Sequence, residues 1–166
     1  MSTPQPGRLG VRVGMGFDVH AFSDDPTRAL TLGGVVFAGS RGLSGHSDAD
    51  VVAHACADAL LGAAGLGDIG EHFPDTDPRW AGADSLLLLT EVSTRVRAGG
   101  WDPVNVDCAL VLEAPKVAPH RDEMQHRLSV AVGAPVAVKA NRAEGLGAIG
   151  RGEGIACYAV ALVAAQ

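Results

Sequence analysis

The segment GIACYAVALVAA, residues 154–165, constrains the fold of this chain more than any other stretch. Polar and apolar residues do not alternate in it, so a strand made from it is apolar on both faces. Such a strand needs a cover on each side, and the segment is too short to cross a bilayer as a helix. We therefore expect it to lie in the centre of a sheet or to be buried by a partner.

The rest of the chain predicts further strands with helices between them. Strands are expected at 11–17, 31–39, 105–114 and 135–140, with Gly33 and Gly34 as a bend or bulge. Helices are expected at 47–65, 84–98 and 119–132, the first capped by Ser47, and residues 66–82 are expected to be loop. This pattern predicts one α+β domain at 11–166, with helices on one face of a mixed sheet of four to five strands.

The composition argues against several classes of protein. Hydrophobic residues make up 47% of the chain and charged residues 19%, which is typical of a globular domain. The net charge is −6 without a basic run, so neither nucleic acid nor a membrane is an expected partner. Residues 1–10 lack the apolar core of a signal peptide and are expected to be a flexible arm. Cys56, Cys108 and Cys157 have no C-x-x-C spacing, which favours buried free thiols in a cytoplasmic protein.

Two polar residues follow the first apolar strand segment. Asp18 and His20 are two positions apart, so in a strand their side chains share one face. In the first predicted helix, Asp50, His54 and Asp58 recur every four residues and form a polar stripe. Asp18, His20 and His54 make the ligand set of a catalytic divalent-metal site with one open position. The alternative is that Asp18 caps a turn and the histidines are surface or satisfied core groups.

Other polar features suit an anionic or hydroxylated ligand. His46 lies just before the first helix, where the helix dipole favours anions. The aspartates of loop 65–78 could hold Ca²⁺ or Mg²⁺, bind sugar hydroxyls, or belong to a solvated turn. Lys116 follows a strand end, where it could meet phosphate or remain solvated. The glycines and arginines of 141–154 could hold phosphate or form a flexible surface loop.

Two glycine patterns match a dinucleotide-binding fingerprint but lack its structural context. GLGDIG at 65–70 follows a predicted helix rather than a strand, and GLGAIG at 145–150 leads into a strand rather than a helix. Neither pattern is therefore evidence for a dinucleotide-binding site.

Motifs along the whole chain resemble one enzyme family. They are GFDVHAF, LGG, GHSDADVVAHACADALLGAAGLGDIGEHFPDTDP, EAPK and GRGEGIA, in this order from about residue 11 to the C-terminus. The chain is similar to the 2-C-methyl-D-erythritol 2,4-cyclodiphosphate synthases of the non-mevalonate isoprenoid pathway. The resemblance implies a lyase that cyclises 4-diphosphocytidyl-2-C-methyl-D-erythritol 2-phosphate and releases CMP. It also implies a homotrimer with active sites between adjacent subunits.

The resemblance assigns expected roles to residues that match the family motifs. Zinc is expected on Asp18, His20 and His54, and a second ion, Mg²⁺ or Mn²⁺, on Glu144. His46 is expected to steady the reacting phosphates, and the segment 112–118 to receive the cytosine. The other expected substrate contacts are Ser47, Asp68, Gly70, Phe73, Asp75, Asp77, Leu112, Ala114, Pro115, Lys116, Asn141, Ala148 and Arg151.

The chain departs from the family pattern in one segment. The family usually has threonines before the glutamate, whereas this chain has Asn141, Arg142 and Ala143 before Glu144. We expect Arg142 to act in catalysis by meeting the phosphates with charge instead of a hydroxyl. Ala148 replaces an aromatic residue of the family's trimer channel. These departures leave open a non-catalytic paralogue that binds metal and an isoprenoid or nucleotide diphosphate, and a metal-dependent hydrolase is a third interpretation.

Overall fold

The computed structural model describes residues 10–166, so nearly all of the expected arm at 1–10 lies outside the described residues. The main sheet has four strands in the order β1-β6-β4-β5. They are β1 (Val11–Ala21), β4 (Trp101–Val111), β5 (Val136–Asn141) and β6 (Gly154–Ala165). β6 pairs antiparallel with β1 and β4, and β4 pairs parallel with β5. Of the two alternatives expected for 154–165, the structure shows the central strand, and the predicted mixed sheet is confirmed.

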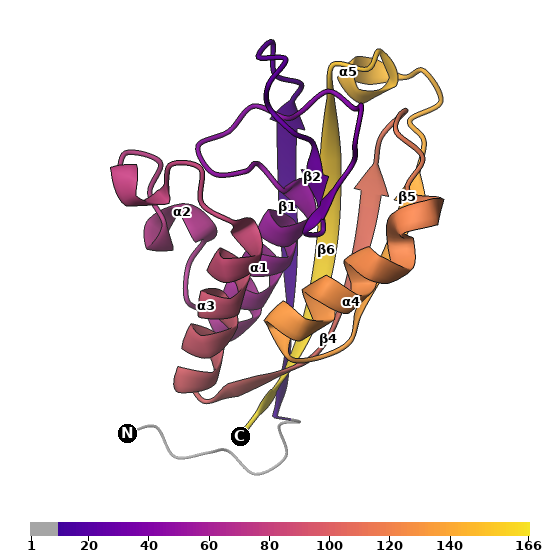
Figure 1. Cartoon of the computed structure of the whole chain (residues 1–166). Helices are drawn as coiled ribbons and strands as arrows, with labels where there is room; N and C mark the ends of the chain where they lie inside the picture. Colours follow the sequence, from indigo (N-terminus) through magenta and orange to yellow (C-terminus); the bar gives the residue numbers. More distant parts are fainter. Residues whose placement is uncertain (1–9) are drawn as a thin grey trace.

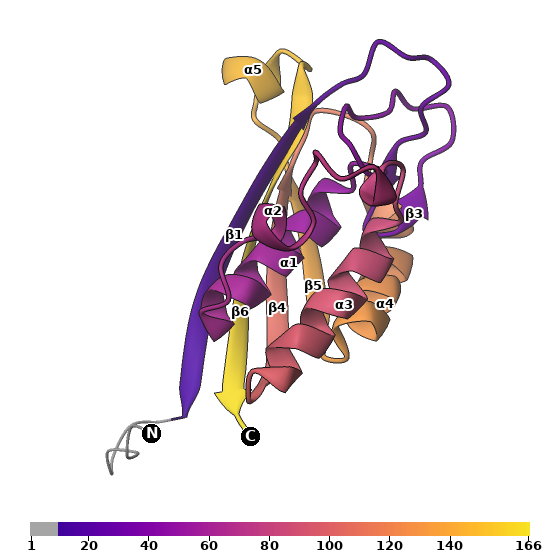
Figure 2. The same cartoon turned by 90° about the vertical axis from the view of Figure 1, so that its left-hand side faces the viewer.

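The long helices cover one face of this sheet (Figures 1 and 2). They are α1 (Val51–Ala64), α3 (Ser85–Ala98) and α4 (Arg121–Val132). The short helices are α2 (Ile69–His72) and α5 (Gly147–Gly150), and 3-10 turns lie at Pro78–Trp80 and Ala118–His120. Two of these elements fall within residues 66–82, so the segment expected to be loop is partly helical. Within residues 10–166, no helix is long and apolar enough to cross a membrane. The expected two-layer α+β fold is confirmed.

The segment 31–39 differs from the prediction. It forms a separate ribbon of two short strands, β2 (Thr31–Leu32) and β3 (Val35–Val36), instead of one strand. Gly33 and Gly34 have φ angles of 57° and 74°, values that glycine adopts without the strain of a side chain. Positive φ at both central residues is typical of a tight hairpin turn. The glycines therefore reverse the chain rather than bend a continuous strand.

Glycines on β1 let α1 lie directly against that strand. A Cβ atom at Gly16 would come within 2.0 Å of the carbonyl oxygen of Ala55, and Gly14 is packed equally closely. Asp18 and His20 continue this two-residue spacing, so they face the same helix. β1 is longer than the predicted strand and includes both residues. The alternation of β1 thus fixes which side of the sheet the polar pair occupies.

Asp50, rather than the predicted Ser47, caps α1. Its carboxylate accepts hydrogen bonds from two N–H groups in the first turn of the helix. It also accepts hydrogen bonds from the N–H groups of both glycines in the β2–β3 turn. Asp50 is completely buried, and this burial raises its pKa to about 6. Asp50 therefore joins the ribbon to α1 and does not belong to an exposed polar stripe.

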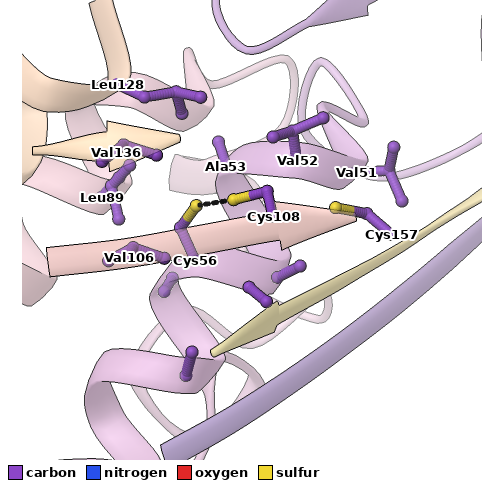
Figure 3. Packing of buried hydrophobic residues seen from close by; sticks show 14 of the residues in the cluster. Val51, Val52, Ala53, Cys56, Leu89, Val106, Cys108, Leu128, Val136 and Cys157 are labelled. Atoms are coloured by element: carbon purple, nitrogen blue, oxygen red, sulfur yellow. Dashed lines mark hydrogen bonds between the residues drawn. The ribbon is translucent and has the colours of Figure 1, made fainter. Parts of the chain in front are cut away.

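The cysteines gather in the core between α1 and the sheet (Figure 3). Cys56, Cys108 and Cys157 are buried free thiols, as predicted. The sulfur atoms of Cys56 and Cys108 are 3.2 Å apart. These residues pack with the aliphatic side chains of the core.

The face of the sheet opposite the helices is apolar, and none of the residues 10–166 covers it. Val13 and Met15 of β1 are 66% and 69% exposed, and Tyr158 and Val160 of β6 are 47% and 45% exposed. These residues alternate with buried residues of the same strands, so they project away from the helices. We call the surface formed by Val13, Met15, Tyr158 and Val160 the open sheet face.

Candidate metal centre and its pocket

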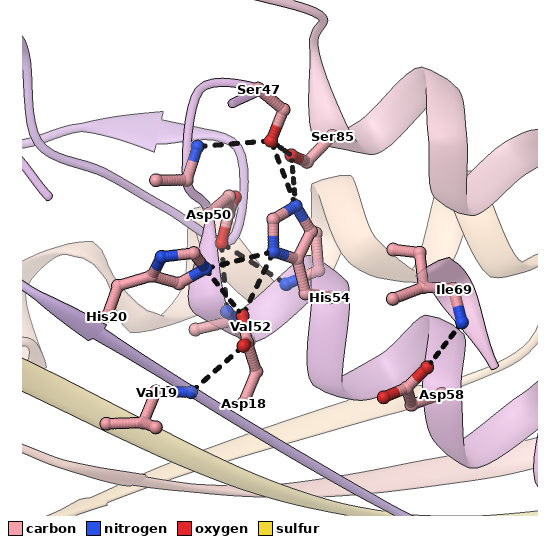
Figure 4. A network of polar contacts seen from close by, with 12 residues as sticks. Asp18, Val19, His20, Ser47, Asp50, Val52, His54, Asp58, Ile69 and Ser85 are labelled. Carbon is pink, nitrogen blue, oxygen red and sulfur yellow. Dashed lines mark hydrogen bonds and ion pairs between the residues drawn. The ribbon is translucent and has the colours of Figure 1, made fainter. Parts of the chain in front are cut away.

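The second half of β1 and the first half of α1 bring together the residues predicted to bind zinc (Figure 4). The Oδ2 atom of Asp18 lies 3.0 Å from Nε2 of His20 and 3.0 Å from Nδ1 of His54. Those two ring nitrogens are 3.3 Å apart. One ligand atom from each side chain lies within 4.8 Å of the other two. The predicted convergence of these side chains is therefore confirmed.

The other ring nitrogens of the two histidines face away from this cluster. Nδ1 of His20 donates a hydrogen bond to the carbonyl oxygen of Ser44 at 2.6 Å. Nε2 of His54 lies 2.9 Å from Oγ of Ser85 and 3.1 Å from Oγ of Ser47. Each ring is thus held with its remaining nitrogen toward Asp18. Such outer hydrogen bonds are typical of histidines that bind metal.

Burial and mutual contacts set the charge of the cluster. Burial opposes ionisation of Asp18, but the His20 and His54 rings beside its carboxylate outweigh burial and hold its pKa well below the usual range. Burial also disfavours the charged form of His20, but the hydrogen bond and negative charge of Asp18 raise its pKa above the ordinary 6.5. An ionised carboxylate beside two imidazole nitrogens is a donor set that suits Zn²⁺. The residues present therefore fit the predicted metal.

The cluster lines a pocket of about 460 Å³. The residues predicted to bind substrate that line the same pocket are His46, Ser47, Gly70, Phe73 and Asp75. Apolar groups that no motif indicated complete the lining, among them Ile69, Trp80 and Leu88. The pocket thus places polar groups beside the metal ligands and offers an apolar surface as well.

Two other predicted aspartates act as helix caps and do not line the pocket. The Asp68 carboxylate accepts a hydrogen bond from the N–H of Glu71 at the start of α2, at 2.9 Å. Asp77 caps the Pro78–Trp80 turn and pairs with the guanidinium of Arg79 at 2.6 Å. The backbone carbonyl oxygen of Asp77 lies 3.0 Å from Nε2 of His46. These aspartates therefore shape the loop that borders the pocket.

The remaining predicted residues form a second group, at the ends of β4 and β5 and around α5. They are Leu112, Ala114, Pro115, Lys116, Asn141, Arg142, Glu144, Ala148 and Arg151. None of these residues lines the pocket that contains the metal cluster. Figure 1 shows α5 beyond the ends of these strands, at the edge of the molecule. In the described part of one chain, the second group thus lies outside the pocket that contains the metal cluster.

Arg142 is held by the carboxylate of Glu113, which lies in the segment 112–118 expected to receive the cytosine but was given no separate role. Its Nε and Nη2 atoms lie 3.0 and 2.8 Å from Oε2 of Glu113. Oε1 of Glu113 accepts a hydrogen bond from the N–H of Gly145 at 3.3 Å. Between these two contacts, Glu144 has a φ of 53°, which is unusual for a residue other than glycine. Glu113 therefore holds both sides of the turn that carries Glu144.

Asp48 and Ser85 also belong to the site, although the sequence did not identify them. Ser85 begins α3 and bonds to Asp48 and His54. Asp48 lies within a recognised motif, but its spacing gave it no separate role. Ser85 is 31 positions from His54, so no local pattern could relate them.

The chain matches the YgbB family over residues 11–164. It is 54% identical to the 2-C-methyl-D-erythritol 2,4-cyclodiphosphate synthase of Bordetella petrii, over 92% of this chain and 95% of that protein. It is 56% identical to the synthase of the same name from Azoarcus sp., with the same coverage of each chain. It is also 54% identical to the bifunctional enzyme IspD/IspF of Anaeromyxobacter sp.. That match covers 92% of this chain but only 40% of the length of the bifunctional protein.

Solved structures of related enzymes have the same fold. The bifunctional IspDF of Campylobacter jejuni is 39% identical, with a TM-score of 0.90 over 96% of this chain and 43% of that chain. The Plasmodium falciparum IspF in complex with CDP is 30% identical, with a TM-score of 0.81 over 96% of this chain and 99% of that chain.

Proposed function

The chain belongs to the YgbB family, and on this basis we propose that it has the activity of a 2-C-methyl-D-erythritol 2,4-cyclodiphosphate synthase. The observation that carries the proposal is that Asp18, His20 and His54 converge in one pocket of a chain that matches the family almost throughout. The substrate would be 4-diphosphocytidyl-2-C-methyl-D-erythritol 2-phosphate. The products would be the cyclic diphosphate and CMP.

The proposed reaction is an intramolecular phosphoryl transfer. An oxygen of the 2-phosphate bonds to the β-phosphorus, and the bond from that phosphorus to the oxygen bridging to CMP breaks. CMP leaves with the electron pair of that bond. The attacking phosphate is already ionised at neutral pH, so no general base is needed. The obstacles are repulsion between anionic groups and the entropy of ring closure, and holding both substrate ends can offset about 7 kcal/mol of the latter.

We propose that residues of the pocket counter both obstacles, the repulsion between anionic groups and the entropy of ring closure. Asp18, His20 and His54 would hold a divalent cation, and this set of donor atoms favours zinc. The cation would supply positive charge beside the phosphates. His46 and Ser47 line the same pocket, and we propose that they donate hydrogen bonds to phosphate oxygens. The other lining residues predicted to bind substrate would orient its erythritol and ribose groups.

We also propose that a neighbouring copy of the chain completes each site. The second group of predicted residues does not line the pocket of its own chain. The open sheet face offers apolar surface that a second copy could cover. In a homotrimer, segment 112–118 of one copy would receive the cytosine of substrate bound at the next. Glu144 would hold the second ion, Mg²⁺ or Mn²⁺, there.

We propose a cytoplasmic location for this enzyme. The three cysteines are buried free thiols, even though the sulfur atoms of two of them are in contact. Thiols that stay unpaired suit a reducing compartment.

Incubation of the protein with the substrate, Zn²⁺ and Mg²⁺ tests the activity. We expect CMP release together with a cyclic diphosphate in the phosphorus NMR spectrum. An open-chain diphosphate would indicate a hydrolase instead. Binding without CMP release would indicate the non-catalytic paralogue, the alternative that the altered residues at 141–143 and 148 favour.

Zinc affinity is expected to fall as the pH drops below neutrality. A proton on Nε2 of His20 competes with the metal, and Asp18 raises the pKa of His20 above its ordinary 6.5. Above the raised pKa of His20, this histidine should not change the zinc affinity with pH. Below that pKa, the zinc affinity should fall about tenfold per pH unit. Chelator competition from pH 5.5 to 8.5 measures this effect. An affinity that stays constant down to pH 5.5 would contradict it.

Replacing Arg142 with threonine is expected to lower kcat/KM about tenfold, a typical effect for a charged hydrogen-bond donor. We propose that the guanidinium leaves Glu113 to bind substrate phosphate. The variant Glu113→Gln weakens the ion pair at nearly constant size. It should preserve or increase kcat/KM if Arg142 binds phosphate. Steady-state CMP release measures both variants, and an unchanged rate in Arg142→Thr would rule out the phosphate role.

A further inference from the structure

A buried chain of polar groups lies behind the candidate metal centre. Ser85 is 1% exposed, and its hydroxyl donates a hydrogen bond to Oδ1 of Asp48. The backbone N–H of Ser85 donates to the other carboxylate oxygen of Asp48 at 3.2 Å. On its other side, Oγ of Ser85 lies 2.9 Å from Nε2 of His54. Figure 4 shows Ser85 beside the edge of the His54 ring that faces away from Asp18 and His20.

The direction of these hydrogen bonds follows from the chemistry of the groups. An ionised carboxylate can only accept, so the hydroxyl proton of Ser85 is committed to Asp48. The Ser85 oxygen can then only accept from His54, which places a proton on Nε2 of that ring. In the neutral imidazole, Nδ1 is therefore free of a proton. Nδ1 is the atom that lies 3.0 Å from Asp18, inside the metal cluster.

The imidazole proton of His54 could also reside on Nδ1 instead of Nε2, and the contacts of Ser85 disfavour that second tautomer. The carboxylate of Asp18 would attract a proton to Nδ1 of His54, where it would occupy the ligand atom. Ser47 also approaches Nε2, at 3.1 Å, but its hydroxyl proton has no carboxylate partner among the described residues. A hydroxyl that is free to rotate can donate or accept, so it does not determine where the imidazole proton resides. The Ser85 hydroxyl does determine where this proton resides, because its own hydrogen is held by Asp48 and its oxygen can only accept.

We propose that Asp48 and Ser85 are positioning residues of the metal centre. They keep the His54 proton on Nε2, so that Nδ1 is always available to the cation. This proposal rests on the proposed metal site but does not require the cyclase activity. It also connects the start of α3 to the centre, because Ser85 is the first residue of that helix.

Zinc affinity tests the proposal with a matched control. We expect Ser85→Ala to weaken zinc binding about tenfold or more, the usual range for loss of a group that orients a ligating histidine. Asp48→Asn keeps one acceptor oxygen and should have a smaller effect. Ser93→Ala is the control, because Ser93 is on the same helix, is 1% exposed and has an Oγ without a hydrogen-bond partner among the described residues. It should bind zinc as the unchanged protein does.

The position of the proton gives a second readout that does not need metal. In metal-free protein labelled with ¹⁵N-histidine at pH 8, we expect the neutral His54 ring to carry its proton on Nε2. This should hold in the unchanged protein and in Ser93→Ala, whereas Ser85→Ala should move the proton to Nδ1. Unchanged zinc affinity and proton position in Ser85→Ala would overturn the proposal. Failure of the unchanged protein to bind zinc would instead refute the metal site, and the NMR result would stand separately.

Discussion

Replacing His54 with alanine is expected to remove zinc binding and to lower kcat/KM for CMP release by about a hundredfold to a thousandfold. The change deletes the ligand atom that α1 contributes and leaves only Asp18 and His20 on β1. Repulsion among the phosphates would then be opposed mainly by hydrogen-bond donors, and loss of a central electrostatic contact costs about two to three orders of magnitude in rate. Metal analysis and steady-state assays measure the two effects.

A matched control separates loss of the ligand from loss of any histidine. His126 is an exposed residue of α4 and does not line the pocket of the metal cluster. His126→Ala should keep both zinc and activity. A His54→Ala protein that retains stoichiometric zinc or normal turnover would contradict the proposed role.

The variant Met15→Asp is expected to convert a trimer into monomers and to abolish activity while zinc binding is retained. Met15 is 69% exposed on the open sheet face, so in the monomer the aspartate costs little. In an assembly that covers this face, the same carboxylate would be buried without a partner, which costs several kcal/mol per interface. The mass in solution should fall from about three times the 16.9 kDa of one chain to the mass of a single chain.

A variant in the helical layer serves as the control for Met15→Asp on the open sheet face. Val130 of α4 is likewise 69% exposed, and Val130→Asp should leave mass and activity unchanged. Retained activity in a monomeric Met15→Asp protein would show that one chain holds a complete site. A monomer in the unchanged protein would contradict the proposed assembly itself.

The sequence predicted the part of the site that depends on local periodicity. Asp18 and His20 share a face because a strand repeats every two residues, and glycines at the same spacing place that face against α1. A helix that brings His54 to this face completes the cluster. The central position of β6 was one of two alternatives that its lack of polar alternation indicated, the other being burial by a partner.

The errors arose where a residue's partner is distant in sequence. Asp50 is the cap of α1 because it also binds the β2–β3 turn, which no local pattern at Ser47 reveals. Two glycines in an apolar stretch fit either a bulge or a hairpin, and only their φ angles distinguish the two. The contacts of Ser85 with His54 and of Arg142 with Glu113 join separate elements, so periodicity could not predict them.

Anomalous diffraction at the zinc edge, from crystals of the protein grown with zinc, tests the central claim most directly. We expect one strong peak per chain at about 2.0–2.2 Å from Oδ2 of Asp18, Nε2 of His20 and Nδ1 of His54. A map in which those three atoms share no peak, while zinc occupies another place or none, would contradict the account.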